Sequence, residues 1–418
     1  MNDRTALNFE QLGLAPALLR AVGDLGLYAP TPIQAEAIPA VLTSSDVWAT
    51  APTGSGKTLA FALPLVQQHL LVPRQTNFRR PVRTLVLVPT RELAVQVGDV
   101  FTRLGYPQQL KVAVVYGGVS INPQMMGLRG GADIVVATPG RLLDLIDHNA
   151  LRLADVQHLV LDEADRLLDL GFADELQRVL ALLPAKRQTL LFSATFAPEV
   201  EALAADLLQD PVRITVEAFE GHQPDITQRA IRVDEKSRTA LLRQLIQQNG
   251  WKQVLVFVAT RYACEHVANK LYKAGIYATP FHGEMSQGAR QDVLHEFRAG
   301  RWDVVVTTDL ASRGIDIAML PVVVNYDLPR SATDYTHRIG RTGRAGAHGD
   351  AVSFVTAAAL AHWQLIQKRE SLELALEQVP GFEPVDQPPA PQGNGGIKGK
   401  RPSKKDKLRA AAAAQKPE

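Results

Sequence analysis

Residues 46–58 read DVWATAPTGSGKT, and this stretch decides the fold. Its first five residues, Asp46–Thr50, are strand-like, its glycines mark a turn, and a helical pattern begins at Leu59. A strand that runs through a glycine-rich turn into a helix is the context of a phosphate-binding loop, because backbone N–H groups and the positive end of the helix then face phosphate oxygens. The generic pattern has glycine where this chain has Ala51, so a plain strand-to-helix turn is the alternative interpretation.

The phosphate-binding interpretation gives each polar position of the loop a role. Lys57 is expected to reach the β- and γ-phosphates of a nucleotide, and Thr58 is expected to ligate Mg²⁺. The positions expected to surround the phosphates are Thr53, Gly54, Ser55 and Gly56. The loop therefore predicts a site for a nucleotide with its magnesium ion.

Short, apolar, β-branched runs alternate with longer amphipathic stretches after this loop. The candidate strands are Thr84–Val88, Val112–Tyr116, Ile134–Ala137, His158–Leu161 and Thr189–Phe192. Helical patterns lie between them, as at Glu92–Leu104 and Asp174–Leu183. Strands that are apolar throughout are typical of parallel sheets buried on both faces. The alternation predicts an α/β fold in which helices cover both faces of a parallel sheet.

The alternation stops once and then restarts. Glu217–Asp225 is polar, contains Gly221 and Pro224, and has no apolar period, which is typical of a linker. The next candidate strands are Ile226–Val233, Val254–Val258, Tyr277–Phe281, Val304–Thr308, Val322–Tyr326 and Ala351–Val355. We therefore predict two α/β domains, at residues 1–216 and 226–370, joined by the linker 217–225.

The composition excludes several classes of protein. Among 418 residues, 46% are hydrophobic and the net charge is +2, so a nucleic-acid surface must be local. The single cysteine, Cys264, allows no intramolecular disulfide, which suits a reducing compartment. No run of about 18 apolar residues predicts a membrane span, and residues 1–10 lack the apolar core of a signal peptide. We expect a cytoplasmic protein with no membrane partner.

The last part of the sequence has a different composition. From residue 384 the chain is rich in proline and glycine, and it then contains seven Lys or Arg residues between Lys398 and Arg409. Such a segment cannot bury enough apolar surface to offset its chain entropy. We predict a disordered basic tail over 384–418, which would add salt-sensitive affinity for nucleic acid or serve only solubility.

Two acids follow the candidate strand His158–Leu161. Asp162 is placed to hold Mg²⁺, and Glu163 is placed to orient and deprotonate an attacking water. Acids after a strand also cap helices, and Asp165 is expected to do this in part. Together with the phosphate-binding loop, the catalytic interpretation is favoured.

The tetrapeptide DEAD at 162–165 resembles the motif of the DEAD-box RNA helicases, a family within helicase superfamily 2. Further blocks that resemble those of the family occur in the expected order, before and after this tetrapeptide, over residues 9–345. The resemblance implies two RecA-like domains that close around ATP and RNA. The short basic tail makes the chain similar to the bacterial RhlE-type members.

The resemblance assigns further residues to the nucleotide. The stretch PTPIQ at 30–34 resembles the Q motif, so Gln34 is implied to recognise adenine, with Thr31 beside it and Phe9 stacking on the base. Asp316 is implied to contact the nucleotide as well. The implied cofactors are ATP and Mg²⁺.

Other blocks imply an RNA surface on both domains. In the first domain the implied residues are Pro89, Thr90, Arg91, Gly118, Thr138, Pro139, Gly140 and Arg141. In the second they are Thr260, His282, Gln287, Arg290, Thr308, Asp309 and Arg313. Backbone N–H groups, small residues and a few cations are suited to following phosphates, which implies little sequence preference.

Two blocks are implied to couple the domains. The segment SAT contains Ser193 and Thr195, whose hydroxyls could instead cap the following helix. The block HRIGRTGR begins with His337 and Arg338, implied to organise the contact between domains, and includes Arg341 and Arg344, implied to be arginine fingers. With Lys57, Asp162 and Glu163, these arginines complete the predicted catalytic set.

The sequence as a whole predicts an ATP-dependent RNA helicase that locally unwinds short duplexes. A DNA-translocating motor of the same superfamily is disfavoured by DEAD in place of DExH and by PTPIQ. An ATP-gated RNA clamp or remodelling factor with little unwinding stays open, because the same residues serve both. We expect a monomer, and by analogy alone a role in ribosome assembly or RNA decay.

Overall fold

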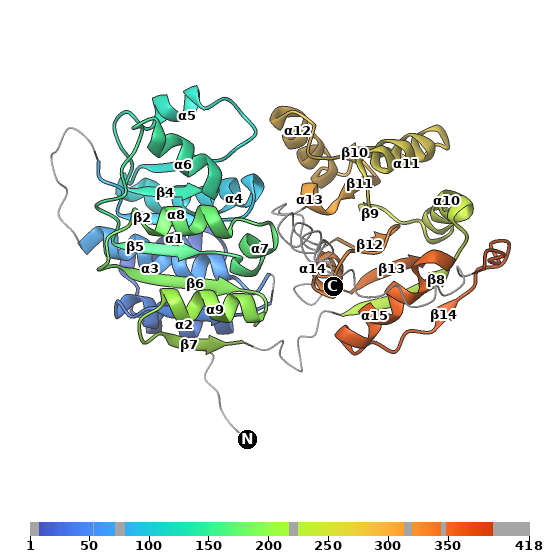
Figure 1. Cartoon of the computed structure of the whole chain (residues 1–418), viewed down its shortest axis with the longest axis horizontal. Coiled ribbons are helices and arrows are strands. Elements are labelled where there is room, and N and C mark those ends of the chain that lie inside the picture. The colour runs from blue at the N-terminus through green and yellow to red at the C-terminus, as the bar shows by residue number, and fades with distance from the viewer. Residues whose placement is uncertain are drawn as a thin grey trace, which may run out of the picture.

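Figure 1 shows the computed structural model, in which two α/β domains lie side by side. The structure describes residues 8–52, 54–71, 80–216, 225–312, 320–343 and 348–387. Several predictions fall outside these residues, namely the site residues Thr53, Arg313, Asp316 and Arg344, the linker at 217–224 and the tail from 388. None of the described helices combines the length and apolarity needed to cross a lipid bilayer.

The first domain is built on a seven-stranded sheet whose order is β3-β4-β2-β5-β6-β1-β7, with every pair parallel. Its strands are β1 (Val47–Thr50), β2 (Thr84–Leu87), β3 (Val112–Val115), β4 (Ile134–Ala137), β5 (His158–Leu161), β6 (Gln188–Ser193) and β7 (Val212–Thr215). The central strands are buried at almost every residue, as a sheet covered on both faces requires.

Helices cover the two faces of this sheet with separate apolar cores (Figure 1). One core joins the sheet to α1 (Pro16–Asp24), α2 (Pro32–Leu42), α3 (Lys57–Leu71) and α4 (Arg91–Gly105). The other joins it to α6 (Pro139–Asp147), α7 (Ala164–Asp169), α8 (Ala173–Leu180) and α9 (Pro198–Leu207). The shorter elements are η1 (Phe9–Leu12), η2 (Tyr106–Gln108) and α5 (Asn122–Gly127).

The second domain repeats this plan with the order β10-β11-β9-β12-β13-β8-β14, again all parallel. Its strands are β8 (Ile226–Arg232), β9 (Val254–Val258), β10 (Ala278–Phe281), β11 (Val304–Thr308), β12 (Val322–Asn325), β13 (Gly349–Val355) and β14 (Leu376–Glu377). Numbered from the first strand of each domain, the two strand orders are identical. The fold repeats although the sequence shows no residue-level repeat.

The second sheet is also covered on both faces. α10 (Arg238–Asn249) and α11 (Arg261–Lys273) pack on one face, and α12 (Gln287–Arg298), α14 (Ala332–Ile339) and α15 (Leu360–Glu370) pack on the other. The short elements are η3 (Glu235–Ser237), α13 (Asp309–Ser312) and η4 (Ala357–Ala359). The predicted class, two RecA-like domains with parallel sheets covered on both faces, is confirmed.

The sequence did not predict β7 and β14, each of which forms one edge of its sheet. β7 is largely exposed, and β14 has only two residues, so neither carries the continuous apolar run by which the other strands were predicted. Because β14 pairs with β8, and Val379 and Phe382 pack against the apolar core, ordered structure continues past residue 370. Backbone N–H groups of Val385 and Asp386 then donate to Asp234.

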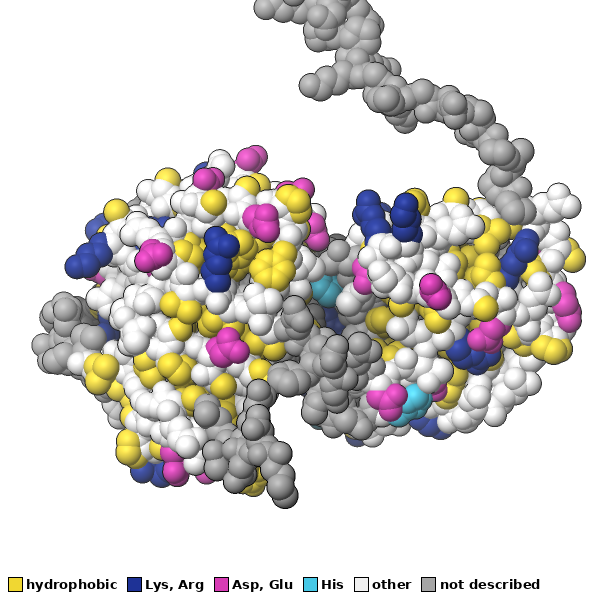
Figure 2. Space-filling model, turned by 90° about the horizontal axis from the view of Figure 1, so that it is seen from below, with side chains coloured by type: hydrophobic (Ala, Val, Ile, Leu, Met, Phe, Trp, Pro, Cys, Tyr) yellow, Lys and Arg dark blue, Asp and Glu magenta, His cyan; other side chains and the backbone are white. Residues whose placement is uncertain are grey.

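Figure 2 views the molecule from below and shows side chains of both charge signs scattered among apolar ones on both domains. This face carries no broad field of one sign, in keeping with a net charge of +2. Any basic surface for a polyanion must therefore be local.

Two histidines of the first domain, one buried and one partly buried, contribute to its sensitivity to acid. His69 on α3 shares a 2.8 Å hydrogen bond with Thr84 Oγ1, and burial lowers the pKa of His69 to about 3. Burial likewise lowers the pKa of His158 to about 4. At pH values between these pKa values and the ordinary value of 6.5, the two imidazoles are protonated in the unfolded chain and neutral in the folded chain. The contribution of these two histidines to stability therefore falls as the pH drops below 6.5.

We expect His69→Gln to reduce this acid sensitivity. At pH 5 the shift of His69 alone corresponds to about 2 kcal/mol of lost stability relative to pH 7.5. Urea unfolding at both pH values, followed for the first domain, measures that difference. The exposed His148 provides a matched control, since His148→Gln makes the same change of residue at the surface. Parallel pH profiles for wild type and His69→Gln would contradict the assignment.

Candidate functional site

The predicted site residues follow the carboxyl ends of the parallel strands. In the first domain the phosphate-binding loop follows β1, PTREL follows β2, TPGR follows β4, DEAD follows β5 and SAT closes β6. In the second domain Thr260, His282 and Thr308 lie at the ends of β9, β10 and β11. Parallel strands bring all their carboxyl ends to one edge, so topology alone collects residues from distant blocks.

The phosphate-binding loop leads directly into the 15-residue helix α3, whose first residue is Lys57. The Lys57 ammonium is nearly buried and donates to the carbonyl oxygens of Ala51, at 2.7 Å, and Pro52, at 3.1 Å. The positive helix end and the lysine together favour an anion at this place. A phosphate group is the anion that this arrangement suits.

The Q motif is packed onto that loop. Gln34 is buried, its Oε1 accepts from Thr31 N at 3.0 Å, and its Nε2 donates to Gly56 O at 3.1 Å. A Cβ at Gly56 would lie 2.5 Å from Gln34 Nε2, and the φ of +93° also favours glycine. Gln34 here ties the loop to α2, and its implied recognition of adenine stays a prediction.

Two other residues predicted to contact the nucleotide lie in different surroundings. Phe9 is 4% exposed and belongs to the apolar core with Leu12, so its packing argues against the implied stacking on adenine. The buried hydroxyl of Ser55 has no hydrogen-bond partner among the described residues. Buried hydroxyls without partners are costly, and a bound polar ligand would satisfy them.

The acids after β5 form the most constrained part of the site. Asp162 is 3% exposed, and Glu163 has a left-handed backbone (φ 51°, ψ 53°), which is strained for a residue with a side chain. Burial, and next the charge of Glu163, raise the pKa of Asp162 to about 7, while Lys57 opposes this. The chain here concentrates negative charge that a cation would stabilise.

This donor set suits Mg²⁺. The ion prefers oxygen ligands and usually takes one or two carboxylates together with phosphate oxygens and water. Asp162 follows β5, and Thr58, the second residue of α3, follows β1, so both offer such oxygens at the carboxyl edge of the same sheet. The fit supports the predicted metal ligands.

The SAT segment is bonded to the last acid of DEAD. Asp165 Oδ2 accepts from Ala194 N at 3.3 Å and from Thr195 Oγ1 at 3.2 Å, while Ser193 Oγ donates to Thr195 O at 3.0 Å. The N-cap of α9 is Ala197, so neither hydroxyl caps that helix. The structure therefore excludes the helix cap, and it ties the SAT segment to an acid of the DEAD tetrapeptide instead.

The remaining residues implied to bind RNA in the first domain line the same edge. Thr90 and Thr138 occupy the N-cap positions of α4 and α6, and Gly118 has a φ of +79°. Arg141 Nη2 donates to Val119 O at 2.7 Å, and its buried Nη1 has no hydrogen-bond partner among the described residues. A phosphate oxygen would satisfy that donor.

In the second domain, Asp309 and Arg338 form a bidentate ion pair of 2.5 and 2.7 Å. Arg338 is 3% exposed, also donates to Asn325 Oδ1 and Asp327 O, and lies over the Phe257 ring. Asp309 is thus engaged within its own domain, which weakens its implied RNA contact. Arg338 likewise organises the second domain itself, whereas the sequence implied a contact between domains.

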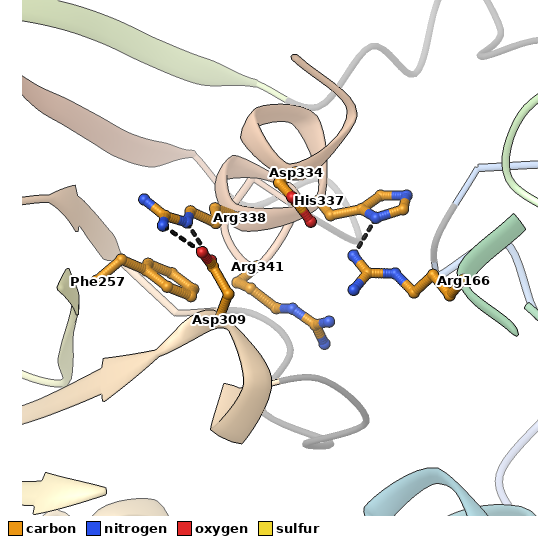
Figure 3. Close-up of a pocket in the computed structure, with 7 residues that line it drawn as sticks. All are labelled: Arg166, Phe257, Asp309, Asp334, His337, Arg338 and Arg341. Atoms are coloured by element: carbon orange, nitrogen blue, oxygen red, sulfur yellow. Dashed lines mark hydrogen bonds and ion pairs between the residues drawn. The ribbon is translucent and has the colours of Figure 1, made fainter. Parts of the chain in front are cut away.

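His337 makes the contact that was predicted for its block. Figure 3 shows Arg166 of α7 pointing across the domain boundary to His337 of α14, with Arg341 extending toward the first domain beside them. Arg166 Nη2 donates to His337 Nδ1, and Arg166 Nε lies 3.8 Å from the carboxylate of Glu163. Arg166 therefore connects the candidate catalytic base to the second domain.

A second interdomain contact joins Glu92 of α4 to Arg290 of α12. The distance from Arg290 Nη2 to Glu92 Oε1 is 2.5 Å, and Arg91 Nε lies 2.8 Å from the same oxygen. Arg290 is 2% exposed and also donates to His282 O and Ala311 O. Burial lowers the pKa of Arg290, and the charge of Glu92 opposes that shift. Arg290 holds this interface together, and its implied RNA contact stays a prediction.

The comparisons with known proteins match this geometry. A profile described as DEAD/DEAH box helicase matches residues 31–203, and one described as helicase conserved C-terminal domain matches residues 237–346. The ATP-dependent RNA helicase DeaD of Mycobacterium tuberculosis (strain CDC 1551 / Oshkosh) is 41% identical over 383 residues, covering 91% of this chain and 67% of the relative. The chain belongs to the DEAD-box family of ATP-dependent RNA helicases.

Two further matches agree with that membership. The ATP-dependent rRNA helicase rrp3 of Sclerotinia sclerotiorum is 40% identical over 389 residues, covering 91% of this chain and 80% of the relative. The structure of S. cerevisiae Dbp5 bound to RNA and ADP BeF3 superposes with a TM-score of 0.78 at 31% identity, covering 89% of this chain and 95% of that one. The similarity to RhlE-type members in particular stays a prediction.

Sequence reasoning on this helicase missed Arg166 and Glu92. Arg166 directly follows DEAD, and Glu92 lies within PTREL. Nothing in the local sequence distinguishes either residue from a solvent-exposed charged side chain. Their partners, His337 and Arg290, lie 171 and 198 positions away, so only the tertiary structure could identify them.

We expect Arg166→Ala to lower the RNA-stimulated rate of ATP hydrolysis by about tenfold, since hydrogen bonds to charged groups contribute roughly 1.5–3 kcal/mol. The KM for ATP should change little, because Arg166 does not belong to the phosphate-binding loop. In an Arg166→Ala background, His337→Ala should then cost little more. The exposed Arg178 offers a matched control, and equal loss for Arg178→Ala would contradict the prediction.

Proposed function

We propose that this helicase locally unwinds short RNA duplexes by RNA-stimulated ATP hydrolysis, which occurs when its two domains close. The observation that carries the proposal is the division of the site between domains. Lys57, Asp162 and Glu163 belong to the first domain, Arg341 belongs to the second, and the Arg166–His337 contact joins them. A hydrolytic site completed only across that boundary makes turnover depend on closure.

Each residue of the site has a distinct part in this proposal. Lys57 and the amino end of α3 hold the phosphates, and Glu163 accepts a proton from the attacking water. Arg341 stabilises the charge that develops on the transferred phosphoryl group, with Arg344 predicted to assist. When bound through Thr58 and Asp162, Mg²⁺ neutralises phosphate charge and relieves the repulsion between the two buried acids.

RNA is the second ligand, after ATP, that we expect to favour closure of the two domains. The implied RNA residues lie at the carboxyl edges of both sheets, so one strand that contacts both edges favours their approach. Thermodynamic linkage then requires that closure also tightens RNA binding. The residues involved suit phosphates better than base edges, which favours weak sequence preference.

The biological context follows by analogy. The Sclerotinia relative is by name an rRNA helicase, which supports ribosome assembly as a setting, with RNA decay as another. We propose a monomer that acts in the cytoplasm.

Glu163→Gln should abolish turnover and leave RNA binding intact. We expect the rate of ATP hydrolysis with single-stranded RNA to fall by at least about a hundredfold, since a general base typically contributes 10²–10⁴. Steady-state hydrolysis with and without RNA, and binding of labelled RNA in a non-hydrolysable ATP analogue, provide the measurements. Asp174→Asn, at an exposed acid of α8, is the matched control and should behave as wild type.

Two outcomes would count against the proposal. Hydrolysis that ignores RNA and responds to DNA would indicate a DNA motor. RNA-stimulated hydrolysis without any displacement of a short duplex, combined with an RNA complex that persists in the ATP analogue, would indicate a clamp.

A further inference from the structure

One face of α11 carries aromatic and basic side chains exposed to solvent. Tyr262 is 74% exposed, and its ring stacks on His266 with centroids 5.5 Å apart and an interplanar angle of 15°. At 100° per residue, Lys273 lies within about 20° of Tyr262 around the helix, and Lys270 lies within about 80°. Lys270 and Lys273 are exposed as well. These four side chains, Tyr262, His266, Lys270 and Lys273, form a stripe that extends along about 16 Å of the helix axis.

The acid beside this stripe is already paired. Glu265 Oε1 lies 3.2 Å from Arg261 Nε and 3.3 Å from His282 Nε2, and Glu284 pairs with Arg261 as well. The lysines of the stripe are farther along the helix than this network. No acid among the described residues pairs with Lys270 or Lys273, so the stripe presents positive charge next to a stacked ring pair, the combination that holds single-stranded nucleic acid.

The stripe begins where the RNA surface of the second domain ends. Thr260, implied to contact RNA, is the N-cap of α11 and accepts from Ala263 N at 3.1 Å. Tyr262 is two residues further along, and His282, also implied to contact RNA, is linked to α11 through Glu265. A strand that leaves the interdomain edge past Thr260 meets Tyr262 first and the lysines afterwards.

We infer that the exposed face of α11, consisting of Tyr262, His266, Lys270 and Lys273, binds the single-stranded RNA that flanks the interdomain site. The inference rests on the proposed function, since it extends the same RNA path. Tyr262 and His266 stack on a base, and the lysines contact phosphates of the following nucleotides. The helicase thus holds a longer strand than its interdomain edge alone, and affinity depends on RNA length.

The test compares a short and a long RNA on the full chain. Fluorescence anisotropy in a non-hydrolysable ATP analogue gives Kd for strands of about six and about twenty nucleotides, the short one filling only the interdomain edge. One variant combines Tyr262→Ala with His266→Ala, and another combines Lys270→Gln with Lys273→Gln. Tyr106→Ala, at an 80% exposed tyrosine of the first domain, is the matched control.

We expect the aromatic variant to raise the Kd of the long strand about tenfold, as loss of one stacked base implies, and to leave the short strand within about twofold. The lysine variant should reduce the slope of log K against log salt by about 1.4 for the long strand only. The control should match wild type for both strands. This pattern supports the inference.

Equal weakening of both strands would overturn it, since Tyr262 would then act on the interdomain edge itself. No change for either strand would also overturn it, and the stripe would then be a surface for a protein partner or a solvated face. Failure of the proposed function can be distinguished from failure of this inference. In that case, the wild-type protein would show no nucleotide-dependent binding of the short strand.

Discussion

The buried acids at the end of β5 are the constraint on which the rest of this helicase depends. Asp162 and Glu163 place two carboxyl groups next to each other in a largely buried position, and burial raises the pKa of Asp162 to about 7. Such an arrangement is unfavourable by itself, and cations relieve it. Lys57 from α3 and Arg166 from α7 supply cations from within the same domain. A metal–nucleotide complex and Arg341 are suited to supply the rest.

The second domain carries buried arginines at or near its boundary with the first domain, and two of them are held in place in different ways. Arg338 is fixed by Asp309, Asn325 and the Phe257 ring, which anchors the amino-acid block that also contains His337 and Arg341. Arg290 is fixed by two carbonyl oxygens and by Glu92 of the other domain. Positioning these cations needs a rigid frame, because an arginine that is free to move loses conformational entropy on each encounter. Some residues of the family blocks, such as Arg338, thus stabilise their own domain, while a neighbour in the same block, His337, contacts the other domain.

The two interdomain contacts have different relations to the site. Arg166–His337 ends on the candidate catalytic base, whereas Glu92–Arg290 lies among the residues implied to contact RNA. In the proposed mechanism, the first contact would respond to the nucleotide and the second to RNA. Because both join the same pair of domains, a ligand that strengthens one favours the other, as reciprocal coupling requires. No direct link between the nucleotide and RNA residues is needed for such coupling.

The sequence by itself determined the central strands, the phosphate-binding loop and the DEAD acids, because each is encoded by local pattern and spacing. It did not determine β7 and β14, since exposed or very short edge strands carry no apolar period. It also could not assign Phe9 to the apolar core, Arg338 to its own domain, or Arg166 and Glu92 to the interface. These roles depend on which side chains meet in the folded chain, across 29 positions for Arg338 and Asp309 and across 171 for Arg166 and His337. Only the shared carboxyl edges of the two sheets bring them together, and that arrangement exists only once the chain has folded.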